Sequence, residues 1–592
     1  MPRIWYDEPL QKSRTVFGAK VIIRTWYEKI RQFLAPLIPG IKWNALVLFL
    51  FALLALAAMY PVVPSFRSHV LGAPGDNVQY AYMTGWVGQS LLLGESPFFD
   101  PRLNYPDGLA LPATDAPFLS MLLVAPVTWL LGPTFAYNLI IFLSHTLSGY
   151  FVYLWIAHLT GNRMGGFVAG VIFLLAPYRL VHSYGHLHMV STQMLPLFFW
   201  SLNSTLTPPR PRELNLWLLG GATFLVGSMS QYYLVMCLVT GVAYALLLLL
   251  PRLDYLFNSG WRLVVSVFFG TLLAILPSFS MLSCGIFQPY GVGRTRIWSA
   301  DPVNFLLPWQ SHPLWGSWIN QLRPEPFSGE KTLYLGIVPL ILAGAGFWLA
   351  QKGLRGRVRV WLAVALIAAI FALGTDLWIN NEPLQHSNPF WLPAYYLSHV
   401  PLLGTMRVWS RFGAITLLFV SLLAGIGTIA ILEHSGRWNR LVLALILVLV
   451  LVDFLPGNAG VAPLGPRPID AWLAQQPGDF AVGFLPPEED TANYQVLFGS
   501  LFHAKQAPAF IHAQHMPRAY REFMLTAYEF PAPAAIEELH DMRLRYLLLE
   551  RSRYNGWRVP VWSEIEAAIA SSPKVKVVTE VGDFVVLEFA EP

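Results

Sequence analysis

The chain of 592 residues is strongly apolar, since 55% of its side chains are hydrophobic and only 12% are charged. Soluble proteins are about 45–50% apolar and about 25% charged, so this composition excludes a disordered chain or a nucleic-acid-binding protein and indicates an integral membrane protein. The net charge of +5 then reports on topology, and two cysteines, Cys237 and Cys284, are too few for a disulfide framework or a cysteine-based zinc site.

The chain begins with a polar, basic segment, residues 1–42, which lacks the short apolar core of a removable signal and is expected to be a cytoplasmic amphipathic lead-in. A bilayer core of about 30 Å needs roughly 20 apolar residues, and about 11 later runs are predicted to span it. These runs are 43–63, 135–158, 165–180, 191–206, 214–230, 232–250, 262–283, 333–350, 360–375, 412–432 and 439–455. The shorter run 117–131 contains Pro126 and is expected to be re-entrant or interfacial, with up to 13 spans as the alternative.

The distribution of basic residues predicts the sidedness of the loops, because short loops rich in Lys and Arg stay in the cytoplasm. Such loops alternate along the chain and include 210–212, 252–262, 352–359 and 437–440. The N-terminus is therefore predicted to be cytoplasmic, with the remaining connections outside the cell membrane. These external loops are 64–115, 181–190, 284–331 and 376–411.

Residues 456–592 have a different pattern, in which β-prone runs alternate with helix-like stretches. The β-prone runs are 480–485, 508–512, 545–550, 575–581 and 584–589, and the helix-like stretches are 469–475, 517–527, 533–541 and 562–571. The predicted fold is thus a polytopic α-helical membrane domain, residues 43–455, followed by a small extracytoplasmic α/β domain, residues 456–592.

The first external loop contains Asp76 directly after the turn Pro74-Gly75, at the start of a predicted interfacial helix, residues 77–93. An aspartate at this place is explained completely as an N-cap that accepts backbone N–H groups. The alternative is a carboxylate at the membrane boundary that takes a proton from an acceptor hydroxyl.

The order of these parts resembles the GT-C superfamily of membrane glycosyltransferases, which use polyprenyl-phosphate-linked sugars. The resemblance lies in a first span with its N-terminus inside, a long external loop with an acid in Gly75-Asp76-Asn77-Val78-Gln79-Tyr80, a multi-span body and an external C-terminal domain. It implies that Asp76 is the essential acid of that loop and that Gln79 and Tyr80 contact substrate. The further pattern, from Trp86 to Tyr105-Pro106-Asp107-Gly108, looks closest to bacterial members such as the YfhO-like group.

The external loop after run 165–180 contains three histidines, His182, His186 and His188. In oligosaccharyltransferases, which this loop resembles, an Asp-x-Asp pair helps to hold a divalent metal, but here the pair position holds His186 and His188. Because Mg²⁺ prefers oxygen ligands, this departure speaks against a magnesium site. The histidines are expected to contact the donor phosphate or sugar, with a zinc or other transition-metal site and a purely structural role as alternatives.

Two arginines, Arg407 and Arg411, precede run 412–432 on the predicted external side, where the positive-inside rule does not favour them. A rigid, permanently charged guanidinium is suited to phosphate, and similar arginines bind the donor phosphate in GT-C enzymes, which this segment resembles. The alternative is contact with lipid headgroups.

The loop 284–331 supplies further candidates, because exposed Trp and Arg side chains can stack on sugars and bind anions. Arg294 and Arg296 are assigned to substrate binding on this ground, and Glu330 is assigned to it because late-loop acids lie near the site in some GT-C relatives, which this loop resembles. The loop's tryptophans are equally typical of an interfacial belt.

These features predict a glycosyltransferase that moves a hexosyl or pentosyl group from a polyprenyl-phosphate donor to a glycan, lipid or protein acceptor in cell-envelope glycan biosynthesis. The chain has no Walker loop and no His-Glu-x-x-His motif, and its spans hold almost no charge, so an ATPase, a protease and a proton-coupled pump are poor candidates. The alternatives are a non-catalytic flippase, exporter or assembly factor for surface glycans, and a degenerate GT-C relative that only binds lipid-linked sugar. No cofactor is assigned, apart from the divalent metal considered above.

Overall fold

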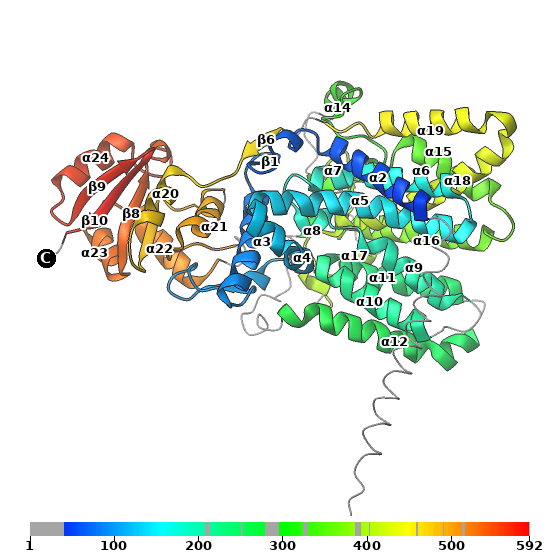
Figure 1. Cartoon of the computed structure of the whole chain (residues 1–592), viewed down its shortest axis with the longest axis horizontal. Coiled ribbons are helices and arrows are strands. Elements are labelled where there is room, and N and C mark those ends of the chain that lie inside the picture. The colour runs from blue at the N-terminus through cyan, green and yellow to red at the C-terminus, as the bar shows by residue number, and fades with distance from the viewer. Residues whose placement is uncertain are drawn as a thin grey trace, which may run out of the picture.

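The computed structural model describes most of the chain, in segments 41–207, 213–249, 253–278, 295–323, 329–384, 392–401, 403–457, 460–488, 491–511 and 516–590. Figure 1 shows a large bundle of helices and, beside it, a smaller part that contains the longer strands. The predicted lead-in lies outside the described residues except for its last two, and so does Arg294.

Each apolar run predicted to span the membrane folds as a helix, because continuous Leu, Ile, Val, Phe and Ala give no strong turn signal until the flanking Gly, Pro or charged residues. The helices are α2 (Ile41–Ala58), α5 (Pro133–Thr160), α6 (Arg163–Leu175), α9 (Met194–Leu206), α10 (Glu213–Met229), α11 (Gln231–Leu249), α12 (Leu253–Ile275), α15 (Ile337–Leu349), α16 (Arg355–Ala372), α18 (Gly413–His434) and α19 (Asn439–Asp453). Among the described residues, five segments are long and apolar enough to cross a membrane by length and composition: Ile41–Ala58, Pro133–Thr160, Gln231–Leu249, Gly260–Ser278 and Trp409–His434. The larger number of spans therefore stays a prediction.

Helix α18 is the centre of the bundle, since it packs against α6, α15 and α16 and is buried along nearly its whole length. Small residues allow this close packing. A Cβ atom added to Gly427 would lie only 1.8 Å from the carbonyl oxygen of Leu342 in α15, so glycine is required there by contact with another backbone.

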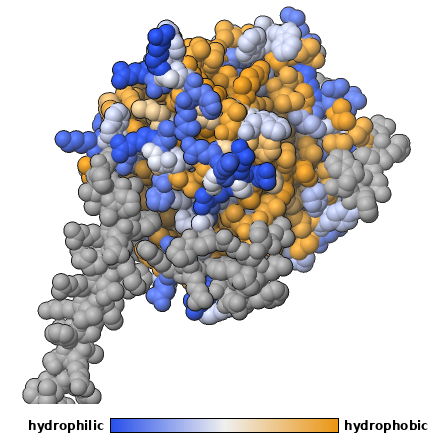
Figure 2. All heavy atoms as spheres, turned by 90° about the vertical axis from the view of Figure 1, so that its right-hand side faces the viewer, coloured by the Kyte–Doolittle hydropathy of each residue, from blue (hydrophilic) through white to orange (hydrophobic). Residues whose placement is uncertain are grey.

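The end of the bundle farthest from the C-terminal strands carries the turn between α18 and α19 (Figure 1). Figure 2 looks onto this end and shows hydrophilic side chains gathered over part of it, with hydrophobic ones around them. The exposed Arg437 and Arg440 belong to this turn, which is the place that the topology prediction gives to cytoplasmic basic residues.

The C-terminal part is built on a four-stranded mixed sheet in the order β7-β8-β10-β9. Strand β7 (Ala481–Leu485) is parallel to β8 (Leu544–Glu550), and β10 (Phe584–Phe589) is antiparallel to β8 and to β9 (Val575–Val581). The surrounding helices are α20 (Pro468–Gln475), α21 (Thr491–His503), α22 (Arg518–Tyr528), α23 (Pro533–Asp541) and α24 (Trp562–Ser571). All four predicted helices are present, whereas α21 was not predicted.

The β-prone run 508–512 does not form a strand where it is described, so that prediction is wrong. Its backbone is bound by a side chain instead: Asn493 Nδ2 donates to the Phe510 carbonyl at 2.6 Å, and Phe510 N–H donates to Asn493 Oδ1 at 3.1 Å. An amide side chain can satisfy both backbone groups of one residue, so no neighbouring strand is needed.

The predicted interfacial helix is α3 (Asp76–Leu93), but it does not lie on the surface. Its residues from Asn77 to Gly88 are buried against α4 (Phe118–Leu131), α5 and α21. The sequence of α3 shows one apolar face. Helix α21, from the C-terminal part of the chain, covers much of the remaining surface of α3. Helix α4 is the predicted short piece, and it runs through Pro126 without a break.

The first loop is tied to the C-terminal part through Arg102. Its guanidinium binds both carboxylate oxygens of Asp100, at 2.9 and 2.8 Å, and donates to the Ser500 carbonyl in α21 at 3.2 Å. It also lies 4.5 Å from the centre of the Trp86 ring in α3. A short antiparallel pair of β1 (His69–Leu71) and β6 (Val461–Pro463) adds a second connection.

Arg102→Ala should destabilise the protein by about 3–5 kcal/mol, because it leaves the fully buried Asp100 carboxylate without its partner. Thermal unfolding of the detergent-solubilised protein measures this loss. Arg518→Ala is the control, since Arg518 pairs with Glu522 on the surface with 91% of its side chain exposed and should change the melting temperature little. Equal losses for the two variants would contradict the role given to Arg102.

Candidate functional site

Ionisable side chains from six elements meet in one cluster. Asp76 is in the first turn of α3, and Glu330 is in a short 3-10 turn, η6 (Gly329–Lys331). Arg411 is in η9 (Trp409–Phe412), directly before α18. The histidines come from α7 (Pro177–His182), the turn that follows it, and α8 (Leu187–Val190). Figure 1 labels three of these elements, α3, α7 and α8, at the end of the bundle nearer to the C-terminal strands.

Glu330 and Arg411 form a buried ion pair, with side chains 7% and 5% exposed. Arg411 Nε donates to Oε2 at 2.9 Å and Nη2 donates to Oε1. Burial alone would raise the pKa of Glu330, but the charge and hydrogen bonds of Arg411, with a hydrogen bond from His182, hold it well below its usual range. Glu330 is therefore ionised, and the charge of Arg411 is already balanced by it.

His182 is oriented by its own helix. Its Nδ1 lies 2.6 Å from the Tyr178 carbonyl oxygen, which can only accept, so Nδ1 carries a hydrogen. Its Nε2 lies 3.3 Å from Glu330 Oε2, another acceptor. The neutral ring would thus turn a lone pair toward a carboxylate, and the contact is favourable only with a proton or a metal cation at Nε2.

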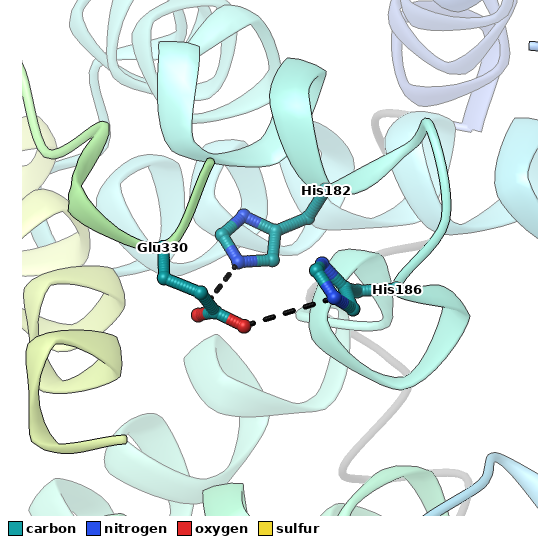
Figure 3. Close-up of side chains that lie close together, drawn as sticks. All are labelled: His182, His186 and Glu330. Carbon is teal, nitrogen blue, oxygen red and sulfur yellow. Dashed lines mark hydrogen bonds and ion pairs between the residues drawn. The ribbon is translucent and has the colours of Figure 1, made fainter. Parts of the chain in front are cut away.

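His186 lies between two carboxylates, with Nε2 at 3.4 Å from Asp76 Oδ2 and 3.8 Å from Glu330 Oε1. Figure 3 shows His182 and His186 both directed at Glu330. Burial lowers the pKa of His186 to about 4, and the charges of His182, Arg411 and Arg407 add to the effect against the opposing charge of Glu330. A neutral ring with its hydrogen on Nε2 therefore fits this position.

His188 connects Arg411 to α3 through a directional chain of hydrogen bonds. Arg411 Nη1 donates to His188 Nε2 at 3.5 Å, so the neutral ring has its hydrogen on Nδ1, which lies 2.6 Å from the Tyr80 hydroxyl. Tyr80 in turn donates to the Asp115 carbonyl at 2.8 Å. Burial and the neighbouring Arg411 lower the pKa of His188 well below its usual value, which keeps the ring neutral.

The sequence did not indicate Asp115 or Tyr232, which complete the surroundings. The Asp115 carboxylate accepts from Ser230 Oγ at 2.5 Å and from the Gln231 N–H at 2.9 Å, and so caps the first turn of α11. This places the Tyr232 ring 4.5 Å from the guanidinium carbon of Arg411, and the Tyr232 hydroxyl accepts from the Arg407 N–H at 3.2 Å. An acid two residues before a proline in a loop gives no sequence signal for such a role.

The other predicted site residues are placed as follows. The guanidinium carbon of Arg407 lies 5.4 Å from the Trp298 ring centre, and its charge reaches His186. Gln79 is buried in α3 beside Tyr80. Arg296 pairs with Asp376 at 3.5 Å, outside the histidine cluster, and Arg294 lies outside the described residues.

Asp76 does not act as the N-cap that the sequence allows. The cap residue of α3 is Gly75, and no side chain caps the helix. Asn77 Oδ1 accepts from the Gly75 N–H at 2.8 Å and from the Val78 N–H at 2.9 Å. Asp76 keeps 44% of its side chain exposed beside His186, while Glu330 is buried.

The cluster could hold a metal ion, since one ligand atom each from His182, His186 and Glu330 lie within 4.8 Å of one another. A ligating histidine commonly donates its other N–H to a backbone carbonyl, as His182 does to Tyr178. Two imidazoles and one carboxylate suit zinc better than magnesium. Arg411 competes for both oxygens of Glu330.

Comparisons with known proteins identify a family and a fold. A family model described as "Domain of unknown function (DUF6311)" matches residues 45–455. The predicted closeness to YfhO-like members is not confirmed by this match. No curated protein matches the sequence.

Among solved structures, the arabinofuranosyltransferase AftD from mycobacteria superposes with a TM-score of 0.59 at 14% identity, over 93% of this chain and 40% of AftD. ArnT from Cupriavidus metallidurans gives 0.49 at 12% identity, over 91% of this chain and 97% of ArnT. The oligosaccharyltransferase of Archaeoglobus fulgidus gives a TM-score of 0.44 at 13% identity, over 93% of this chain and 74% of the oligosaccharyltransferase. The chain spans 40% of the length of AftD, and it shares the fold of this glycosyltransferase, as the resemblance to GT-C enzymes implies.

Acid should destabilise the protein between about pH 6.5 and pH 4. A histidine in an unfolded chain has a pKa of about 6.5, whereas that of His186 is about 4. The unfolded state therefore binds the proton first, so stability is complete above this range and is lost as the pH falls through it.

Melting temperatures of the detergent-solubilised protein, measured from pH 7.5 to pH 4.5, test this expectation. His186→Gln should make the profile less steep, with the remaining slope due to other histidines of lowered pKa such as His188. His540→Gln, a change at an exposed position, should leave the profile as in the wild type. An unchanged profile in His186→Gln would contradict the neutral state of this ring.

Proposed function

The chain belongs to the DUF6311 family, and we propose that it is a glycosyltransferase that transfers a sugar from a polyprenyl-phosphate-linked donor to an acceptor hydroxyl at the outer face of the membrane. The observation that carries this proposal is the convergence of Asp76, His186, Glu330 and Arg411 in one cluster. The fold shared with AftD supports it.

Asp76 is proposed as the general base. It is the accessible carboxylate of the cluster, whereas Glu330 is buried and bound to Arg411. As the acceptor oxygen bonds to C1 of the sugar, its proton passes to Asp76. The bond between C1 and the phosphate oxygen breaks at the same time, and the polyprenyl phosphate leaves with the electron pair.

Arg407 is proposed as the principal ligand of the donor phosphate. Among the described residues it has no ion pair, and the Trp298 ring beside it can support a stacked guanidinium. Arg411 is held to Glu330 through two nitrogens and to His188 through the third. Its charge acts on the leaving phosphate from behind this network, through the low-dielectric surroundings.

The neutral histidines are proposed to orient neighbouring side chains and the substrate by hydrogen bonds, and not to supply charge. His186, with 31% of its side chain exposed, can donate to Asp76 or to a substrate hydroxyl. Both ring nitrogens of His188 are engaged, by Tyr80 and Arg411, so it acts by holding Arg411 in place. Gln79 and Tyr80 then support the site from within α3.

The rival function is a non-catalytic flippase, exporter or assembly factor for surface glycans. Such a protein has no need for an exposed carboxylate beside a neutral imidazole and a buried ion pair, so the convergence of these groups favours the enzyme. A degenerate relative that binds the donor without turning it over would keep the same cluster, and an activity assay separates it.

A zinc-dependent form of this enzyme is a second candidate, which the orientation of His182 favours. With Nδ1 committed to the Tyr178 carbonyl, Nε2 is the atom that a cation would use beside Glu330. Bound zinc would supply a Lewis acid for the phosphate oxygens. His182, His186 and Glu330 would hold it.

Asp76→Asn should lower transfer at least about a hundredfold, the usual contribution of a general base, without impairing folding. Mass spectrometry of envelope glycans and lipid-linked sugars, from cells with and without each variant, measures the transfer. Asp107→Asn removes an exposed acid of the same loop and is the control. Full activity of Asp76→Asn would remove Asp76 from the role of base.

The zinc-dependent form predicts about one zinc ion per chain in the protein purified without chelator, by elemental mass spectrometry, as a tight structural or catalytic site binds one. His182→Ala should lose the ion, and His540→Ala should retain it. Chelation should abolish transfer and zinc should restore it. Wild-type protein that is active without any metal would exclude this candidate.

A further inference from the structure

The accessible side of the cluster is formed by Asp76, Gly185 and His186. Asp76 and His186 are 44% and 31% exposed, and Gly185 is partly exposed as well. A Cβ atom added to Gly185 would lie 3.6 Å from the Cβ of Asp76, with no closer neighbour. A molecule that reaches the Asp76 carboxylate on this side therefore passes over Gly185.

An aromatic pair includes the residue next to Gly185 in the chain. Tyr184 directly precedes Gly185, and its ring centre lies 5.9 Å from that of Trp309, with 37° between the planes. Both side chains are partly exposed. Tyr184 is fixed to the start of α3, because its carbonyl accepts from Asn77 Nδ2 at 3.2 Å.

This pair is separate from the aromatic side chain that accompanies the proposed phosphate ligand. Arg407 stacks near Trp298, which belongs to the same external segment as Trp309 but makes a different contact. Trp298 thus lies beside Arg407. Trp309 lies beside Tyr184, in the segment that also carries Gly185 and His186. A transfer reaction has two reactants, the donor and the acceptor, and each needs a binding site of its own.

We propose that Trp309 and Tyr184 form the acceptor subsite and that the acceptor is a saccharide. This rests on the proposed function, since it gives a substrate to the base of that reaction. A sugar ring has an apolar face of C–H groups and a rim of hydroxyls. Partly exposed Trp and Tyr rings offer a rigid, amphipathic surface for the face, and Asp76 and His186 offer an acceptor and a donor for the rim.

Binding without turnover tests this subsite. Short pentose and hexose oligosaccharides, and a Ser/Thr peptide of similar length, are titrated against the full-length protein in detergent, with saturation-transfer NMR as the readout. Trp309→Ala should bind the oligosaccharide about tenfold more weakly, which corresponds to about 1.4 kcal/mol, and Trp309→Phe should recover part of the loss. Trp318→Ala is the matched control, since Trp318 is 52% exposed in α14 (Gly316–Leu322) of the same loop.

Gly185→Ala provides a second, milder variant, because the added methyl group makes only ordinary contacts. It should weaken oligosaccharide binding at least as much as Trp309→Ala by filling the approach to Asp76. Asp76→Asn should keep the binding and lose transfer. Loss of transfer in Asp76→Asn with unchanged binding in Trp309→Ala and Gly185→Ala would overturn the subsite alone.

Three outcomes would count against the saccharide acceptor: no oligosaccharide binds, the peptide binds in a Trp309-dependent manner, or Trp318→Ala has the same effect as Trp309→Ala. Trp309-dependent oligosaccharide binding in a protein whose Asp76→Asn variant is fully active would support the subsite and contradict the assignment of the base.

Discussion

The buried ion pair of Glu330 and Arg411 is the interaction on which the arrangement of the site depends. Moving each charge out of water costs several kcal/mol, and only close, hydrogen-bonded pairing offsets this cost. The pair joins the short turn before α15 to the start of α18, the central helix of the bundle. Removing either partner would leave a charge in surroundings that keep His186 and His188 neutral.

The pair also determines which charges are available to a substrate. It neutralises Arg411, so a bound phosphate meets the positive charge of Arg407 first. The pair acts on His186 in both directions: burial keeps this ring neutral, the charge of Glu330 opposes that effect, and the charge of Arg411 adds to it. Asp76 Oδ2 then lies 3.4 Å from Nε2 of a neutral imidazole, which can donate a hydrogen bond to it.

The sequence predicted the features that depend on neighbouring residues. Hydropathy located the helices well, as in run 135–158, which is α5 (Pro133–Thr160). Pro74-Gly75 marked the start of α3 at Asp76, and alternating β-prone runs located four strands of the C-terminal sheet. Asp76, His186 and Arg411 were chosen because the segments that carry them resemble those of GT-C enzymes, and the structure brings these three into one cluster.

Features that depend on contacts between distant segments were missed or placed less well. The sequence gives α3 one apolar face, and only the position of α21 explains why the rest is buried. Asp115 shows the limit most clearly. The preference of an aspartate for a helix N-terminus is general, but the N-terminus that Asp115 caps, at Gln231, lies 116 residues later in the chain. Local rules state what kind of partner an acid needs, and the packing of the bundle decides which helix supplies it.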